Sequence, residues 1–224
     1  MNYPHPQKRR VHREEVVAKI ERMNVMLKQF SEEIILQFEL IPADRKLLLN
    51  KLTSYIQGNR NAGKESLLMF ICTHNSRRSH FGQILCALAA DFYQVTGIKT
   101  FSAGTEVTAF HPNAIAALRS IGMEIQSADN GSNPHYNVSW GSTNSLDAYS
   151  KLIDDVGNPK EHFAAIMTCT HAEQNCPFVL GADFRIGLPF EDPKVYDGTP
   201  QEAAMYLSRV HQMAIELYYV FSKL

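Results

Sequence analysis

The sequence predicts an α/β fold built on a parallel sheet, preceded by a helical extension. From residue 66 onward, continuous apolar runs alternate with segments whose apolar residues recur at steps of three and four. Strands that alternate with helices in this way are typical of a parallel sheet. The run "LLMFI" at 67–71 has no polar interruption, as expected for a strand that is covered on both faces.

The length of the chain favours one main domain and a smaller appendage. A chain of 224 residues can hold a core domain of about 150 residues with an extension. The texture of the sequence changes near residue 65, so we divide the chain into a helical extension, 1–65, and a main domain, 66–224.

The extension contains two predicted helices. Apolar residues recur at helical spacing over 14–40, and Pro42 ends that pattern. A second helix is predicted from residue 43, and Gly58 with the following "NRNAGK" closes it. We expect the apolar faces of both helices to pack against the main domain or against a second copy of the chain. A homodimer through these helices is therefore one expected assembly.

The main domain continues with five more predicted elements and one long loop. These are a helix over 78–95, a strand over 99–103, a helix over 112–122, a strand over 163–169 and a helix over 200–224. Pro112 begins the middle helix and Gly122 ends it. Residues 126–162 are rich in Gly, Ser and Asn and are predicted to form a surface loop, whose length is typical of functional or disordered segments.

Charge and composition exclude several classes of partner. Lys and Arg number 22 against 23 Asp and Glu, a formal net charge of −1, so no long-range field attracts nucleic acid or an anionic membrane. The first residues lack the apolar stretch of a signal peptide, and no run approaches about 20 apolar residues. We therefore expect a cytoplasmic protein. Four cysteines are too few for a disulfide scaffold, which favours metal binding or catalysis for those in polar surroundings.

A cysteine stands where the first strand meets the next helix. Five residues separate Cys72 from Arg78 in "CTHNSRRS". A strand that ends before this segment and a helix that starts near its end force the backbone to curl, so that its amides converge above the helix N-terminus. Such a nest binds phosphate-like anions and stabilises a thiolate. We predict that Cys72 is a nucleophile and that Arg78 grips a tetrahedral oxyanion with its planar fork.

The remaining loop residues complete the predicted oxyanion site. Asn75 tolerates the left-handed backbone that such a loop needs, and the Ser79 hydroxyl could hydrogen-bond the thiolate. Arg77 could face solvent or add positive potential at the rim. The alternative is a structural cysteine at a strand end, followed by arginines on a solvated helix start. The whole predicted anion-binding set is Thr73, His74, Asn75, Ser76, Arg77, Arg78 and Ser79.

"CTHNSRRS" resembles the C-x5-R-S signature of the low-molecular-weight protein tyrosine phosphatases and of the thioredoxin-coupled arsenate reductases that share their fold. The resemblance extends over about residues 66–224 and includes "FSAGTE" at 101–106. It implies a four-stranded parallel sheet with helices on both faces. The phosphatases usually place an aromatic residue soon after the Asp-Pro of their general-acid loop, where this chain has Lys194. Many reductases have Gly, Cys and Glu where this chain has His74, Arg77 and Gln83.

Two further thiols follow a predicted strand in "MTCTHAEQNCP". The segment is similar to the one that carries the second and third redox cysteines of the arsenate reductases. This likeness implies a disulfide that passes from Cys72 and Cys169 to Cys169 and Cys176 by thiolate attack on the bonded sulfur. Two alternatives stay open: both cysteines are structural, or they bind zinc together with the repeated "CTH" at 72–74 and 169–171. No C-x2-C pair supports zinc, so we predict no metal and no cofactor. Cys86 lies on an apolar helix face and is predicted to be core.

An acid for the reaction is predicted in "LPFEDPKVYDGTP". Asp192-Pro193 matches the loop that supplies the general acid in both families, and a carboxyl at the mouth of the site can protonate a leaving oxygen. A polar turn fixed by proline is the structural alternative, and Glu191 and Asp197 are lesser candidates for the same role.

These residues predict a cysteine-dependent oxyanion enzyme of the arsenate-reductase type. Cys72 would attack arsenate, the Cys169/Cys176 pair would take over the disulfide, and thioredoxin or a similar dithiol protein would reduce it. The alternative is a phosphatase that hydrolyses phosphotyrosine or another phosphomonoester through a phosphocysteine. A third hypothesis is an anion-binding module without activity, in which the helical extension recruits a partner.

Overall fold

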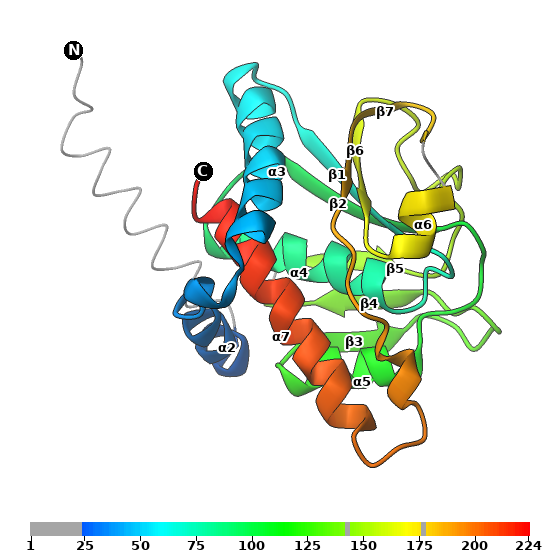
Figure 1. Ribbon diagram of the computed structural model, residues 1–224. Coiled ribbons are helices and arrows are strands. Elements are labelled where there is room, and N and C mark those ends of the chain that lie inside the picture. Colours follow the sequence, from blue (N-terminus) through cyan, green and yellow to red (C-terminus); the bar gives the residue numbers. More distant parts are fainter. Residues whose placement is uncertain (1–23, 142–143, 176–177) are drawn as a thin grey trace.

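The computed structural model of the protein describes residues 24–141, 144–175 and 178–224. Its main sheet has four strands in the order β2-β1-β6-β7, and each neighbouring pair is parallel. The predicted fold class, a four-stranded parallel sheet flanked by helices, is confirmed (Figure 1). The strands are β1 Ser66–Cys72, β2 Ile98–Gly104, β3 Glu124–Ser127, β4 Tyr136–Ser139, β5 Ser145–Ala148, β6 Phe163–Met167 and β7 Ala182–Gly187. The helices are α2 Val25–Ile35, η1 Phe38–Leu40, α3 Ala43–Asn61, α4 Arg78–Phe92, α5 Pro112–Ser120, α6 Thr170–Asn175, η2 Pro193–Tyr196 and α7 Glu202–Phe221.

The two faces of the sheet pack against different partners. Side chains alternate along a strand, so Leu68 and Phe70 of β1 join the large cluster with α4, α7 and the N-terminal helices. Met69 and Ile71 point the other way, into a smaller cluster with Cys169 and Ala172 beneath α6. Burial on both faces explains why β6 is apolar throughout and why β1 is apolar after Ser66.

The N-terminal helices pack on the main domain. Figure 1 shows α3 beside the C-terminal half of α7, with α2 close to it. The Arg45 guanidinium on α3 donates to the Glu216 carboxylate on α7 at 2.8 Å, and the hydroxyls of Ser31 and Tyr218 lie 2.6 Å apart. The helix predicted over 14–40 ends at Ile35, where the chain turns into η1. Its first ten residues lie outside the described part of the chain.

The segment predicted as one long loop is more ordered than the sequence suggests. Strands β3, β4 and β5 form a separate antiparallel sheet over 124–148. The side chains of Ile125, Val138 and Ala148 are buried in the large cluster. The prediction of an irregular surface loop over 126–162 was therefore wrong for its first half. Strands of four residues with polar outer faces give too short a pattern to distinguish from a loop.

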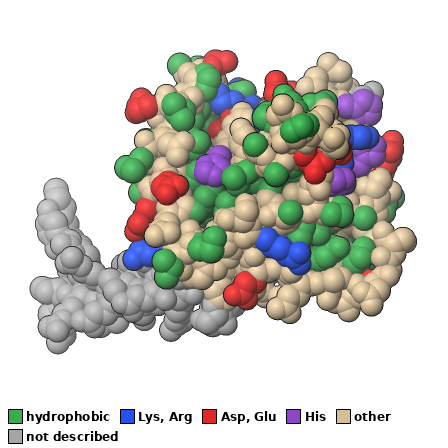
Figure 2. All heavy atoms as spheres, turned by 90° about the horizontal axis from the view of Figure 1, so that it is seen from below, with side chains coloured by type: hydrophobic (Ala, Val, Ile, Leu, Met, Phe, Trp, Pro, Cys, Tyr) green, Lys and Arg blue, Asp and Glu red, His purple; other side chains and the backbone are tan. Residues whose placement is uncertain are grey.

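The surface agrees with the balanced composition. Figure 2 shows acidic and basic side chains of both signs interspersed on one face of the molecule. Within the residues that the structure describes, every helix is too short or too polar to cross a lipid bilayer.

Candidate active site

The anion loop, residues 73–77 between β1 and α4, turns its carbonyl groups away from its own centre. The Thr73 carbonyl accepts from the Glu106 amide at 2.8 Å, and the Ser76 carbonyl accepts from the His111 amide at 3.0 Å. The His74 carbonyl accepts from the hydroxyls of Thr108 and Ser150. Among the described residues, no hydrogen bond uses an amide of 73–77 as its donor. These amides are thus available to an anion, as the predicted nest requires.

Asn75 and Ser79 hold the sulfur of Cys72. Asn75 has a φ of 42°, the left-handed conformation predicted for it. Its side-chain amide donates to the Ser79 hydroxyl at 2.7 Å, and that hydroxyl lies 3.1 Å from the Cys72 sulfur. Because the Ser79 hydroxyl already accepts a hydrogen bond from Asn75, its own hydrogen can point to the sulfur. The sulfur of the predicted nucleophile thus has a hydrogen-bond donor directed at it.

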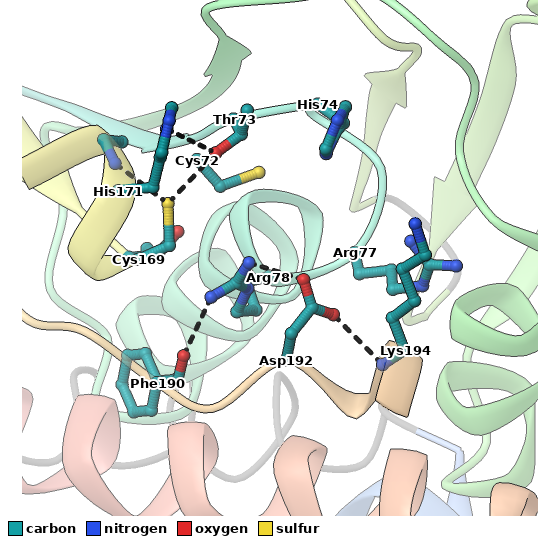
Figure 3. A network of polar contacts seen from close by, with 12 residues as sticks. Cys72, Thr73, His74, Arg77, Arg78, Cys169, His171, Phe190, Asp192 and Lys194 are labelled. Carbon is teal, nitrogen blue, oxygen red and sulfur yellow. Dashed lines mark hydrogen bonds and ion pairs between the residues drawn. The ribbon is translucent and has the colours of Figure 1, made fainter. Parts of the chain in front are cut away.

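Arg78 and Asp192 meet at the mouth of the loop (Figure 3). The Arg78 guanidinium donates to the Phe190 carbonyl at 2.9 Å and to the Asp192 carboxylate at 2.5 Å. Its side chain is only 12% exposed, so the fork is held at the site rather than in solvent. Asp192 also accepts from the Lys194 amide and begins η2. The structure therefore brings together the predicted anion ligand and the predicted proton donor.

Arg77 does not face solvent, which was the first of the two positions expected for it. Its guanidinium is buried and donates to the Tyr206 hydroxyl at 2.6 Å and to the Asp197 carboxylate at 2.9 Å. Burial opposes ionisation of Asp197, but hydrogen bonds from Tyr206 and the charge of Arg77 hold the pKa of Asp197 below its ordinary value. Burial and the bond to Asp197 raise the pKa of Tyr206 to about 12. Arg77 thus ties the anion loop to the segment that follows Asp192.

Cys169 lies beside the loop because β6 pairs with β1. The Thr168 amide donates to the Ile71 carbonyl at 2.7 Å, which places the residue after each strand at the same edge of the sheet. The Cys169 sulfur lies 3.6 Å from the Thr73 hydroxyl, and Figure 3 shows Cys169 next to Thr73 and Cys72. Cys176, predicted as the third redox cysteine and as a further ligand in the zinc alternative, lies outside the described residues.

Cys86 is fully buried in the large cluster, as predicted. Burial raises the pKa of its thiol well above the ordinary value, so this thiol stays protonated.

The sequence did not point to the residues that support the loop from behind. The Lys151 amide donates to the Asn75 side-chain oxygen at 2.8 Å, and the Lys151 carbonyl accepts from the Gly104 amide at 2.9 Å. Ser150 bonds the His74 carbonyl through its hydroxyl. His80 stacks on Phe110 with ring centroids 4.1 Å apart, and burial followed by the Lys151 charge lowers its pKa. None of the supporting residues Ser150, Lys151, His80 and Phe110 belongs to a motif with known chemistry, so only the fold reveals their role.

The chain is similar in sequence to known proteins. No protein-family model matches the chain. Over 148 residues it is 26% identical to an arsenate reductase from Bacillus subtilis (strain 168), which covers 66% of this chain and 88% of that protein. Two similar solved structures are a YwlE mutant from Bacillus subtilis, with TM-score 0.49, 15% identity and coverage of 71% and 98%, and a low-molecular-weight phosphotyrosine phosphatase from Vibrio cholerae O395, with TM-score 0.48, 12% identity and coverage of 70% and 95%. The part of the predicted resemblance that concerns the arsenate reductases is confirmed: the chain is similar in sequence to enzymes of that name.

Proposed function

We propose that this chain reduces arsenate to arsenite through Cys72 and a Cys169/Cys176 disulfide relay. The observation that carries the proposal is the position of Cys169, whose sulfur lies 3.6 Å from the hydroxyl of Thr73, the residue next to Cys72. A phosphatase reaction needs no second thiol at this edge of the sheet. The similarity to an arsenate reductase and the "NCP" ending of 175–177 support the same assignment.

In the first step the Cys72 thiolate attacks arsenic. The loop amides and Arg78 hold the oxyanion, a sulfur–arsenic bond forms, and an arsenic–oxygen bond breaks. Asp192 gives a proton to the departing oxygen, which leaves as water.

In the second step the Cys169 thiolate attacks the Cys72 sulfur. A disulfide forms, the sulfur–arsenic bond breaks, and its electron pair stays on arsenic. Arsenic is thereby reduced from As(V) to As(III), and the two thiols are oxidised. Cys176 then displaces Cys72 from Cys169, and a dithiol protein such as thioredoxin reduces the Cys169–Cys176 disulfide.

Phosphomonoester hydrolysis is the second candidate, because Cys72, Arg78 and Asp192 alone would suffice for it. Cys72 would displace an alcohol or phenol from phosphorus, Asp192 would protonate it, and water would hydrolyse the phosphocysteine. The contact of Arg78 with Asp192 at 2.5 Å favours this chemistry as much as arsenate chemistry. The rim offers Lys194 rather than an aromatic platform directly after Asp192-Pro193.

The two candidates are separated by one substitution measured in two assays. Cys169→Ser should abolish arsenate turnover with a thioredoxin system while leaving slow hydrolysis of p-nitrophenyl phosphate, because only the relay needs the second thiol. Cys72→Ser should abolish both activities. Cys86→Ala, which changes a thiol buried away from the loop, is the matched control and should retain both. Equal arsenate turnover in the Cys169→Ser variant and the unmodified chain would reject the relay.

A further inference from the structure

The thiol of Cys169 is connected to an imidazole through a hydroxyl. The Thr73 hydroxyl oxygen lies 3.6 Å from the Cys169 sulfur and 3.3 Å from Nδ1 of His171. Figure 3 shows the Thr73 hydroxyl in contact with both side chains at the edge of the anion loop. The Ala172 amide also donates to the Cys169 sulfur, at 3.3 Å. Cys169 itself is 2% exposed, whereas His171 is exposed to solvent.

The order of these groups allows a proton to move in one direction. A hydroxyl carries one proton and can accept another hydrogen bond. If the Cys169 thiol donates to Thr73, the Thr73 proton is free to point to His171. Nδ1 of a neutral imidazole can accept this proton when Nε2 carries the ring N–H. The buried thiol therefore has an exposed base at the end of a two-bond path.

We propose that His171, acting through the Thr73 hydroxyl, accepts the proton of Cys169 and so generates the thiolate that attacks Cys72. The inference rests on the proposed function, because only the relay requires an ionised Cys169. The proton balance is complete: the sulfur loses a proton to Thr73, Thr73 passes its own proton to His171, and the exposed imidazolium returns it to water. His171 is a positioning residue in this scheme, since it reaches the reacting sulfur only through Thr73.

The backbone amide of Ala172 also favours loss of the Cys169 proton. The thiolate left behind keeps the Ala172 amide as a hydrogen-bond donor at 3.3 Å, and such a bond stabilises the charged form. Other ionisable groups lie around this corner: Cys72 at the end of β1, His74 in the loop and Arg78 on α4 (Figure 3). Glu173 on α6 and Arg185 on β7 bound it from the other side, where Arg185 donates to the Glu173 carbonyl at 2.5 Å. A variant must therefore be compared with its parent over the same pH range.

The first test titrates the thiolate without any substrate. In a Cys72→Ser, Cys176→Ser parent, ultraviolet absorbance reports Cys169 ionisation, because Cys86 stays protonated. The step is assigned by its loss in Cys169→Ser. His171→Gln and Thr73→Val should both move this step to higher pH. Thr73→Ser, which keeps the hydroxyl, and His162→Gln, which changes an exposed histidine paired with Asp183, should leave it in place. Coincident curves for all variants would overturn the inference.

The second test follows the reaction itself. In a Cys176→Ser parent, rapid quenching and mass spectrometry measure formation of the Cys72–Cys169 disulfide after arsenate is added. His171→Gln should slow this step about 100-fold at neutral pH, the scale of general-base catalysis, and the rate should recover as the pH rises. A parent that forms no disulfide would reject the arsenate proposal while leaving the titration result valid. If the parent forms the disulfide at the same rate as its His171→Gln and Thr73→Val variants, the proton transfer to His171 is rejected and the arsenate proposal stands.

Discussion

Lys151 is a buried lysine whose ammonium has few compensating partners. The residue is 3% exposed, its Nζ lies 3.4 Å from the Tyr149 carbonyl, and it lies 4.2 Å from the centre of the Tyr149 ring. Burial lowers the pKa of Lys151 from 10.5 to about 8, although Asp147 and Asp155 oppose the shift. Its charge is therefore a cost to the folded state, while its backbone supports Asn75.

This cost predicts a pH dependence of stability. Below pH 8 both states carry the charge and the folded state bears the full cost. Between 8 and 10.5 the folded state has lost the proton and the unfolded state still binds it, so stability rises with pH. Since one pKa unit corresponds to about 1.4 kcal/mol, this contribution is on the order of 3 kcal/mol. Urea denaturation should show that the free energy of unfolding of the unmodified chain rises over this pH range relative to that of Lys151→Met. A difference that does not change with pH would contradict the prediction.

Arg77 makes a second prediction at the scale of one residue. Arg77→Met leaves the Asp197 carboxylate and the Tyr206 hydroxyl without their shared donor. We expect a loss of about 1–3 kcal/mol of stability, the cost of an unsatisfied buried polar group, and a lower kcat because the segment carrying Asp192 loses its tie to the anion loop. Arg60→Met, which changes an exposed arginine at the end of α3, is the control. Thermal unfolding and phosphatase kinetics measure both effects, and an unchanged kcat would show that the tie does not position the acid.

The residues of the loop show what a sequence can reveal at this scale. The left-handed Asn75 and the contact of Ser79 with Cys72 were predicted, because local spacing dictates a tight turn between a strand and a helix. The role of Arg77 was not, because its partners Asp197 and Tyr206 lie more than a hundred residues away. Lys151 escaped for the same reason: its contact with Asn75 spans 76 residues.

At the scale of elements, β2 ends against the anion loop with no space for a side chain. A Cβ on Gly104 would lie 2.6 Å from the Glu106 carbonyl oxygen and 2.7 Å from the Asn75 nitrogen. Both are backbone atoms, so the strand and the loop would have to separate.

Gly104→Ala should therefore weaken phosphate or arsenate binding and cost about 1–3 kcal/mol of stability, as overpacking does. Gly58→Ala is the matched control, because a Cβ there meets nothing within 4 Å and alanine suits a helix interior by about 0.5–1 kcal/mol better than glycine. Isothermal titration with phosphate and chemical denaturation distinguish the two variants. Equal phosphate affinity in both would show that the loop absorbs the methyl group.

The elements found from the sequence are those with a strong period or a continuous apolar run. Strands β1, β2 and β6 and helices α3, α4, α5 and α7 lie close to the predicted ranges. The sequence pattern did not identify β7, because "ADFRIG" mixes charged and apolar residues at the sheet edge. Helix α6 was also missed: six residues are too few for a helical period.

At the scale of the whole molecule, the N-terminal helices share one core with the main domain. Leu27, Ile34, Leu49, Leu52 and Ile56 are fully buried in the same cluster as the α7 side chains. Tyr55 on α3 stacks on Phe184 of β7 with centroids 5.0 Å apart. Division of the chain into two domains at residue 65 remains a prediction. Because the two parts share one hydrophobic core, we expect them to unfold together.

Removal of residues 1–65 tests that boundary. Each of the buried leucines and isoleucines contributes about 1.5–3 kcal/mol to the free energy of unfolding. The truncated chain should therefore lose cooperative unfolding, or aggregate, because the apolar face of α7 becomes exposed to solvent. Circular dichroism and size-exclusion chromatography provide the readout. A truncated chain that unfolds cooperatively at the original temperature would show that the main domain is independent. The same chromatography of the full chain tests the proposed homodimer.

The contact between Arg78 and Asp192 has a consequence for how the chemistry is timed. The guanidinium that would bind an oxyanion is the same group that holds the carboxylate of the expected acid. An oxyanion that binds in the loop would compete with Asp192 for that guanidinium, so binding would release the carboxylate from its contact with Arg78. Under the proposed function, substrate binding would then set the moment at which Asp192 turns toward the leaving oxygen.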